Sequence, residues 1–467
     1  MKRYSIKSCF LMLLILMACD FGDTNTDPTR LQDVDVWNIL PAAQAQSARN
    51  AGSIGARVTG TVIQHFKGTS LQPESYMNYV LDENIIDDYW RTGLYVGAMK
   101  DCNIIIQKSN AQNLPHYRGV AKVLMAYNLA LATSLWGDVP YSDAFQGEAN
   151  LTPLYDTQQE VYATIQRLLD EALFDFARSP GLFAPKADDL VFGGNMARWA
   201  ATARALKARY YLHLTKVDND AAVKALTELA MGSIGSNSLQ PDFPFENTPN
   251  GGNPLAFFAV DRAGQMELGT YLVNLMTSRN DPRLTYYGAR SGSVYDISGT
   301  GVFWTTYTTP IPLISYAEVE FIRAEAYLRL GDDVKAAESL KKAITANMTR
   351  IGLTETAYQN YVNTQGAFSA QQTYEDRLKQ IVEQKYIALY GQGTIEAWVD
   401  YRRTGYPVLT PTPNAQTSFF SEGVPVIPRR YLYPQSERSA NHAHYLEAIE
   451  RQGGHKLDND LWAFKSN

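Results

Sequence analysis

Cysteine is scarce in this chain: the 467 residues include only Cys9, Cys19 and Cys102. The first two belong to an N-terminal export segment described below, which leaves Cys102 without a partner in the rest of the chain. An intramolecular disulfide is therefore excluded. The fold must be stabilised by packing, and the chain is long enough for a large core.

A long hydrophobic run is also missing. The apolar run near the N-terminus, Phe10–Ala18, has nine residues, whereas a helix that crosses a bilayer needs about 20. Lys2, Arg3 and Lys7 precede this run. A positive start, a short apolar stretch and small residues at its end are typical of a secretory signal. We therefore predict that residues 1–18 form a signal peptide.

Charge of one sign does not dominate the composition. The chain has 42 Lys and Arg residues against 48 Asp and Glu residues, for a formal net charge of −6. Proteins that bind nucleic acids carry a basic patch or stripe. Because no such patch stands out, the sequence argues against a nucleic acid as partner.

The common catalytic motifs are absent. The chain has no P-loop, no G-x-G-x-x-G after a strand, no H-E-x-x-H and no G-x-S-x-G. His442 and His444 form an H-x-H pair without an evident third ligand, so we interpret them as surface or loop residues rather than metal ligands. A glycosidase would need two carboxylates that face each other across a cleft, and nothing in the sequence nominates such a pair. We predict that the protein is not an enzyme and has no cofactor.

Among the features that are present, the tetrapeptide Leu16-Met17-Ala18-Cys19 resembles a bacterial lipobox. In lipobox proteins the chain is cut before the cysteine and the cysteine thiol is lipidated. One acyl chain, such as a palmitate, binds a membrane only marginally, whereas several chains on one cysteine bind it firmly. We predict that Cys19 is the lipidated first residue of the mature protein. The alternative is a plain signal peptide with a cysteine at this position by chance.

Residues 19–35 form an acidic, turn-rich segment that cannot build a core. We predict a solvated tether here, and acidic residues after the cysteine resemble a surface-export signal of Bacteroidetes-type lipoproteins. Asp23, Asn25 and Asp27 also imitate the first half of an EF-hand loop. Pro28 occupies the place of the sharp-turning glycine, and the twelfth position lacks the glutamate. Calcium binding is therefore possible but is not predicted.

Apolar residues recur at three- and four-residue steps in many segments after the tether, which is typical of amphipathic helices. The sequence predicts helices over 87–109, 117–135, 154–177, 195–216, 219–231, 315–330, 334–348, 374–390 and 394–401. We therefore expect a mostly α-helical fold.

The helices come in pairs. The segment Ser315–Met348 resembles a tetratricopeptide repeat, with small residues where the two helices approach and a glycine at the turn. Glu320 and Arg323 replace the aromatic residue and the leucine that such a repeat usually has. The other pairs fit the pattern more loosely. We expect helical hairpins of this kind over about 117–231 and 315–401.

Two stretches, about 236–310 and 405–439, are rich in Gly, Pro, Asn, Ser and Thr. Loops of this length are uncommon in compact domains unless they have a function, and binding residues concentrate in loops. Aromatic residues make up 12% of the chain, with 29 tyrosines. We expect a helical scaffold that presents an irregular, aromatic-rich surface to a ligand.

Three segments resemble the SusD/RagB family of outer-membrane lipoproteins. They are LWGDVPYSDAF (Leu135–Phe145), EAWVDYRRTGYPVL (Glu396–Leu409) and RYLYPQSERSANHAHYLEAI (Arg430–Ile449). The resemblance implies one SusD-like domain over 36–467. It also implies a place on the outer face of the outer membrane and a SusC-type TonB-dependent transporter as partner. The ligand would be a glycan, or sometimes a peptide, that is captured for import without chemical change.

The resemblance also implies candidate ligand-binding residues. Family members bind their ligand with an aromatic residue from the N-terminal part of the chain and with others from the loops before the helix that starts near residue 315. Flat aromatic rings can cover the apolar face of a sugar. The candidates are Trp90, Tyr95, Tyr295, Trp304 and Tyr307. Trp90 and Tyr95 could equally be core residues. We expect Trp304 at the surface, because its neighbours are Thr, Tyr and Gly.

The motif residues also have a structural interpretation. We expect the first motif to end a helix and the second to form a buried brace with Arg–carboxylate pairs. The residues concerned are Trp136, Gly137, Asp138 and Pro140 in the first motif and Trp398, Asp400, Arg402 and Arg403 in the second.

Two other functions stay open at this point. One is a scaffold of helical repeats that binds a peptide or a protein. The other is an enzyme, such as a glycosidase.

Overall fold

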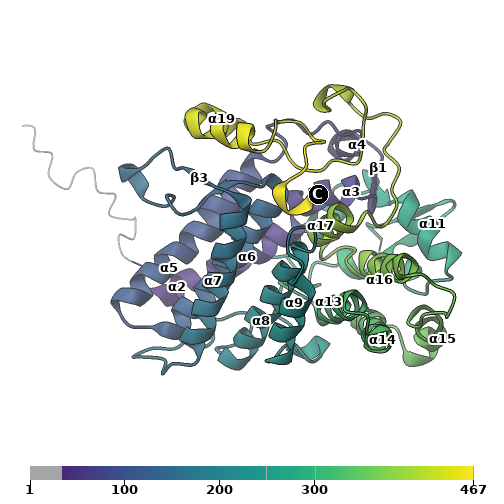
Figure 1. The fold of residues 1–467 in the computed structure, drawn as a ribbon, viewed down its shortest axis with the longest axis horizontal. Helices are drawn as coiled ribbons and strands as arrows, with labels where there is room; N and C mark the ends of the chain where they lie inside the picture. The colour runs from purple at the N-terminus through teal and green to yellow at the C-terminus, as the bar shows by residue number, and fades with distance from the viewer. Residues whose placement is uncertain (1–33, 249, 300, 466–467) are drawn as a thin grey trace, which may run out of the picture.

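The computed structural model describes residues 34–248, 250–299 and 301–465, and the fold is mostly α-helical (Figure 1). The predicted signal peptide 1–18, Cys19 and the tether up to residue 33 lie outside the described residues. So do Asp23, Asn25 and Asp27, the residues that imitate a calcium loop. In the described part of the chain, no helix has both the length and the apolar character that crossing a membrane requires.

The first group of helical hairpins consists of α6 (Pro115–Trp136), α7 (Gln158–Phe176), α8 (Met196–His213) and α9 (Ala221–Ala230). Pro115 starts α6, where its missing N–H costs nothing. Thr157 and Glu160 form a capping box at the start of α7. Nearly every residue of α6 is buried, because α6 lies in the centre of the fold with α7 on one side and α5 on the other.

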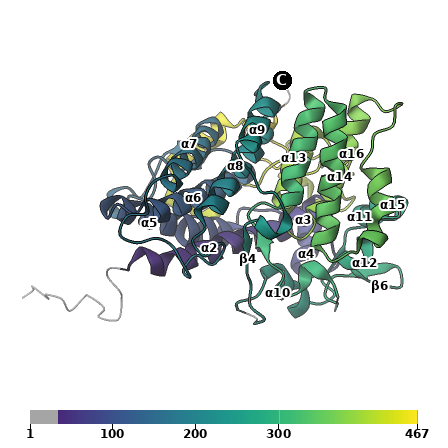
Figure 2. The same cartoon turned by 90° about the horizontal axis from the view of Figure 1, so that it is seen from below.

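The second group consists of α13 (Tyr316–Arg329), α14 (Asp333–Arg350), α15 (Glu355–Gln365), α16 (Tyr374–Ala388) and α17 (Thr394–Thr404). Gly331 makes the turn between α13 and α14 with φ +78°, and the carboxylate of Asp332 accepts from the Lys335 backbone N–H to cap α14. Helix α13 packs against both α14 and α9, so the two groups form one continuous row of helices (Figure 2).

The N-terminal helices are α2 (Val36–Gly52), α3 (Ile54–Val62), α4 (Leu71–Met77) and α5 (Lys100–Ala111). Helices α2 and α5 pack against α6, α3 packs against α17, and α4 packs against α3. The single helix predicted over 87–109 is a π-helical segment, η2 (Tyr89–Met99), that continues into α5. The sequence prediction missed the change of helix type, because the two turn sizes give similar apolar spacing over so short a stretch. π-Helical turns are rare and often accompany functional sites.

The stretch predicted as irregular, 236–310, contains short elements that pair over long distances in the chain. Its helices are α10 (Pro254–Asp261), α11 (Thr270–Ser278) and α12 (Leu284–Tyr287). An antiparallel sheet has the order β1-β5-β7-β6, formed by β1 (Phe66–Gly68), β5 (Met266–Leu268), β7 (Val294–Asp296) and β6 (Ala289–Ser291). Phe66 pairs with Leu268, and Ala289 with Asp296.

Two further strand pairs tie loops to the scaffold. They are β2 (Val139–Pro140) with β3 (Tyr155–Asp156), and β4 (Asp242–Phe243) with β8 (Ile311–Pro312). Short 3-10 turns are η3 (Gly147–Ala149), η4 (Asn237–Leu239), η5 (Phe303–Thr305), η6 (Thr417–Phe419) and η7 (Trp462–Phe464).

The C-terminal segment crosses the top of the molecule in Figure 1, where it forms α18 (Gln435–Ala440) and α19 (His442–Arg451), and then returns toward the centre, where η7 lies near its end. Trp136, at the end of α6, is fully buried, and its indole N–H donates to Leu432 O at 2.9 Å. Trp398 likewise donates to Pro428 O at 2.8 Å. The motif tryptophans therefore end or brace helices, as the structural interpretation of the sequence predicted.

Candidate functional site

Trp304 is fully buried, so the prediction that it lies at the surface is wrong. Its ring packs edge-to-face on Phe303, with the centroids 4.8 Å apart, and covers Gly391, where a Cβ atom would overlap the indole. The small residues around Trp304 in the sequence indicated exposure. In the fold, the turn η5 directs the indole toward the loop between α16 and α17, where a glycine makes room for it.

Trp90 and Tyr95 lie together, with their ring centroids 4.8 Å apart. Trp90 is buried against Trp136, and its indole N–H donates to Glu437 Oε1 at 3.2 Å. Tyr95 is half-buried, and its hydroxyl donates to Pro140 O at 2.8 Å. Both line a shallow cavity of about 300 Å³. Trp90 is thus a core residue that lines this cavity, whereas Tyr95 keeps part of its surface exposed.

Tyr295 and Tyr307 are half-buried and belong to other parts of the fold. Tyr295 lies in β7 opposite Arg290. Tyr307 lies in the loop before β8, where its carbonyl accepts from the Asn253 N–H at 2.8 Å. The five candidates therefore do not converge on one site. Ligand contact by Tyr95, Tyr295 and Tyr307 stays a prediction.

A larger groove of about 450 Å³ opens beside the β1 strand, and we call it the β1–α11 groove. Three segments far apart in the chain form it: residues 61–79, 269–271 and 410–414. Phe66 and Tyr79 are buried in its floor, and Tyr271 is half-buried in its wall. The residues that line it are Thr61, Gln64, Phe66, Lys67, Met77, Tyr79, Gly269, Thr270, Tyr271, Thr410, Pro411, Thr412, Pro413 and Asn414.

Backbone contacts hold the segments of the groove together. The Gly269 N–H donates to His65 O at 2.9 Å, and a Cβ atom on Gly269 would overlap Gln64 O, so only glycine permits this approach. The side-chain amide of Gln64 donates to Thr410 O at 2.6 Å. The Gln416 N–H donates to Asn78 O at 2.7 Å. The proline- and threonine-rich loop 410–414 is thereby fixed over the strand.

The groove combines an apolar floor with a polar rim, as small-molecule sites commonly do. Burial, with a smaller contribution from Glu383, raises the pKa of Tyr271 to about 12, so its phenol stays neutral and can donate a hydrogen bond at neutral pH. Lys67, Asn414 and the threonines supply further partners for hydroxyl groups. The sequence analysis missed Tyr79 and Tyr271, because only the fold brings these tyrosines and the loop 410–414 together.

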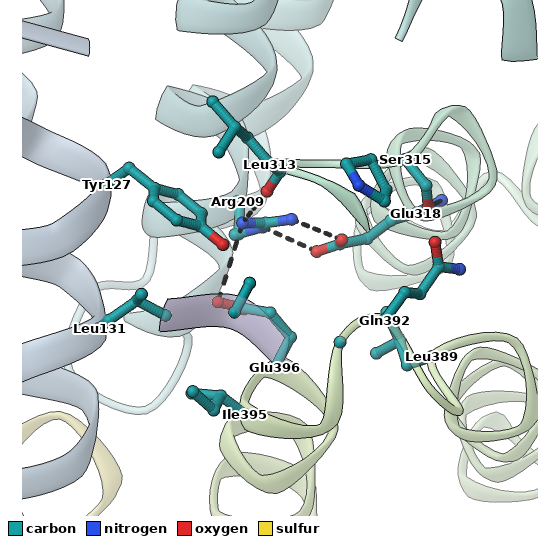
Figure 3. A pocket seen from close by; sticks show the side chains of 13 residues that line it. Tyr127, Leu131, Arg209, Leu313, Ser315, Glu318, Leu389, Gln392, Ile395 and Glu396 are labelled. Atoms are coloured by element: carbon teal, nitrogen blue, oxygen red, sulfur yellow. Dashed lines mark hydrogen bonds and ion pairs between the residues drawn. The ribbon is translucent and has the colours of Figure 1, made fainter. Parts of the chain in front are cut away.

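A second, enclosed cavity lies between α6, α8, α13 and α17 (Figure 3). Arg209 donates to Glu318 at 2.7 and 2.5 Å, and its guanidinium lies 3.8 Å from Glu396. Burial by itself raises the pKa of Glu396, but Arg209 and His213 outweigh it, so this pKa lies below its ordinary value. With a volume of about 20 Å³, the cavity has room for one water molecule and not for a nutrient. We interpret it as part of the core.

The two histidines of the H-x-H pair lie in α19 and have different partners. His442 Nδ1 contacts Arg438 O at 3.1 Å, whereas His444 Nδ1 contacts Glu447 at 3.2 Å. In the residues that the structure describes, no group of three or more His, Cys, Asp or Glu side chains is placed to hold a metal ion.

Comparison with known proteins supports the fold and the resemblance. Residues 28–434 match a SusD-like family model described as "Starch-binding associating with outer membrane". Among solved structures, a chitin-binding protein has 24% identity and a TM-score of 0.79 over 92% of this chain and 100% of its own.

Two further solved structures have the same fold. A chitin-binding SusD homolog from Flavobacterium johnsoniae has 22% identity and a TM-score of 0.78 over 92% of this chain and 99% of its own. A SusD/RagB family protein from Bacteroides thetaiotaomicron has 23% identity and a TM-score of 0.74 over 93% of this chain and 100% of its own. No curated protein matches the chain.

Proposed function

The chain belongs to the SusD-like family, and from this premise we propose that it is a nutrient-binding lipoprotein of the outer membrane. It captures an oligosaccharide and delivers it to a SusC-type TonB-dependent transporter. In this proposal residues 1–18 are removed, Cys19 carries the lipid, and the protein faces the exterior of the cell. The ligand leaves unchanged, because the protein binds it without covalent chemistry.

The observation that carries this proposal is the β1–α11 groove. Its volume of about 450 Å³ lies in the range of small-molecule sites, roughly 300 to 1,000 Å³. Tyr271 offers an aromatic face at the wall, and Lys67, Asn414 and the threonine hydroxyls surround it. A sugar ring presents an apolar C–H face and a rim of hydroxyl groups, so its two chemistries match those of the groove.

The family description names starch, and two of the similar solved structures are named as chitin-binding. We therefore propose an uncharged oligosaccharide as ligand, with malto-oligosaccharides and chito-oligosaccharides as the first probes. Both present the apolar C–H face of a pyranose ring to an aromatic side chain.

The test is retention of these oligosaccharides, measured by isothermal titration, by the wild-type protein and by Tyr271→Ala. We expect the variant to bind about tenfold more weakly or worse, because it loses the aromatic contact in the groove wall. Tyr271→Phe keeps the ring and should retain most of the affinity. Tyr95→Ala tests the smaller cavity beside Trp90 as the alternative site.

Unchanged affinity in Tyr271→Ala, together with loss of binding in Tyr95→Ala, would move the site to the smaller cavity. New reducing ends after incubation with polysaccharide would contradict the absence of enzymatic activity. To test the partner and the anchor, the protein is purified from membranes. We expect a plugged-barrel transporter to copurify with the wild type but not with Cys19→Ala.

A further inference from the structure

A second pocket, separate from the β1–α11 groove, lies between α13, α14 and the residues that follow α9. It has a volume of about 310 Å³ and a mostly polar lining. Tyr316, Glu320, Arg323 and Tyr327 line it from α13. Their spacing of four, three and four residues places all four side chains on one face of that helix. We call this cavity the α13–α14 pocket; Figures 1 and 2 show the two helices side by side.

Glu320 and Arg323 are two of the three residues at which the segment departs from the tetratricopeptide pattern; the third is Met348, in place of a proline. A repeat of that kind has large apolar residues at the first two positions, which fill the space between helices. In this chain a carboxylate and a guanidinium occupy the space instead. Local departures of this kind from the rules of a stable fold are typical of functional positions.

The carboxylate of Glu320 is buried, but only one of its two oxygens has a partner. The residue is 6% exposed, and Oε1 lies 3.3 Å from Arg323 Nε. Oε2 has no hydrogen-bond partner among the described residues. A buried carboxylate oxygen without a partner is costly. A ligand group that donates a hydrogen bond from the pocket would remove this cost.

Arg323 is already engaged by the protein. Its Nη2 donates to Leu229 O at 3.1 Å and to the Ser233 hydroxyl at 3.3 Å. Burial raises the pKa of Glu320, and the nearby Arg323 and Lys342 reverse only part of this shift. The carboxylate therefore lacks sufficient positive charge from its own surroundings, which favours a ligand that brings a cation.

The opposite wall comes from α14 and carries charges of both signs. Lys335 donates to Asp332 at 2.7 Å, and its ammonium lies 5.4 Å from the centre of the Tyr327 ring. This cation–π contact occupies the ring face that a sugar would otherwise stack on. Glu338 and Lys342 are exposed at the rim. The pocket thus presents carboxylates and ammonium groups, and little free aromatic surface.

We propose that the α13–α14 pocket binds a small zwitterion, either a free amino acid or a short peptide. Its ammonium group donates to Glu320 Oε2, and its carboxylate pairs with Lys342 at the rim. The site is independent of the oligosaccharide groove, so it adds a second class of ligand to the protein.

The test uses glycine and diglycine as probes, titrated into the full-length mature protein by calorimetry. N-acetylglycine lacks the ammonium group and glycinamide lacks the carboxylate, so both should bind more weakly than glycine. Glu320→Gln keeps the shape of the side chain and should weaken diglycine binding about tenfold or more, because it removes the charge-assisted hydrogen bond. Lys342→Met should also weaken diglycine binding, because it removes the ammonium group that pairs with the carboxylate of the ligand.

Glu148→Gln, at an exposed position in η3, is the matched control and should bind diglycine as the wild type does. Crystals of the wild-type protein soaked in diglycine give a second measurement that does not depend on any variant. We expect the ammonium nitrogen within hydrogen-bond distance of Glu320 Oε2.

Equal diglycine affinity in Glu320→Gln and the wild type would overturn the proposal. So would the absence of heat and of density with diglycine at its solubility limit. Oligosaccharide binding that depends on Glu320, without diglycine binding, would also overturn it and assign a sugar subsite instead. Tyr271→Ala should leave diglycine binding unchanged, which separates this test from that of the groove.

Discussion

Arg403 in α17 and Glu325 in α13 form a two-pronged ion pair in the core. Arg403 Nη2 lies 2.5 Å from Glu325 Oε2, and Nη1 contacts Oε1. Both side chains are almost entirely buried. Arg403 also donates to Asp400 Oδ1 at 2.7 Å, and Lys385 lies 2.9 Å from Asp400 Oδ2. The pair therefore joins α13, α16 and α17 in the centre of the second helical group.

Replacing Glu325 by Gln should destabilise the protein strongly at neutral pH. Removing one partner of a buried pair leaves an uncompensated charge and costs about 3–5 kcal/mol. Urea unfolding measures this cost as a change in the free energy of unfolding. Arg167→Ala breaks an exposed pair in α7 and should cost less than about 1 kcal/mol. A loss in Glu325→Gln no larger than in this control would show that the pair contributes no stability.

The same pair should weaken in acid. Burial by itself raises the pKa of Glu325, but Arg403 and Arg329 outweigh it and hold the pKa well below its ordinary value. A carboxyl with a depressed folded-state pKa stabilises above its unfolded pKa, about 4.3, and loses this contribution as the pH falls further. The difference in unfolding free energy between the wild type and Glu325→Gln should therefore narrow below about pH 4.

His455 should make the C-terminal segment sensitive to mild acid. Burial, followed by the nearby charge of Arg430, lowers the pKa of His455 to about 3. The neutral ring accepts the Tyr433 N–H at Nε2, at 2.7 Å, a bond that protonation would break. Because the pKa of His455 in the folded protein lies below the unfolded value of about 6.5, the neutral ring contributes fully to the stability of the fold above pH 6.5. Its contribution is lost as the pH falls toward 3, by about 1.4 kcal/mol per pH unit.

The measurement is urea unfolding between pH 7 and 5, a range in which ordinary carboxylates stay ionised. His455→Gln should lower the slope of the unfolding free energy against pH by about 1.4 kcal/mol per pH unit, which corresponds to one bound proton. His444→Gln, at the more exposed His444 in α19, should leave the slope unchanged. Identical slopes in the wild type and His455→Gln would contradict the burial of a neutral ring.

Trp304→Ala should act on stability rather than on ligand binding. The truncation leaves a cavity beside Gly391 and should cost about 3–5 kcal/mol. Trp304→Phe should cost less, because the indole Nε1 has no hydrogen-bond partner in the described structure and its loss removes a buried polar group. Thermal unfolding and oligosaccharide titration check both variants. If Trp304→Ala unfolds at the wild-type temperature but no longer binds the oligosaccharide, Trp304 contacts the ligand and this prediction is wrong.

Helix positions could be predicted from the sequence because they depend on local spacing. The stretch 315–330 predicts α13, and 334–348 lies within α14. The buried brace could be predicted only in part. Arg403 pairs with Asp400 within the motif, but its other partner, Glu325, lies in α13. Arg402 donates to the carbonyls of Trp398 and Arg429 rather than to a carboxylate. The sheet could not be predicted, because β1 pairs with β5 about 200 residues later and each strand has only three residues.

Site residues were harder to predict than helices. Tyr95 is half-buried at a cavity although its chain neighbours are the apolar Leu94 and Val96, whereas Trp304 is buried in the core although Thr305 follows it. Tyr79 and Tyr271 were missed because nothing near either of them in the chain indicates the other. The exposure of a ring depends on which distant segment covers it.

The sequence by itself determined the helical hairpins and the family, because both depend on residues close together in the chain. Only the tertiary structure decided which aromatic rings meet the solvent, where the β1–α11 groove opens and that one oxygen of Glu320 lacks a partner. These features depend on contacts between segments that are far apart in the chain, and such contacts leave no local pattern.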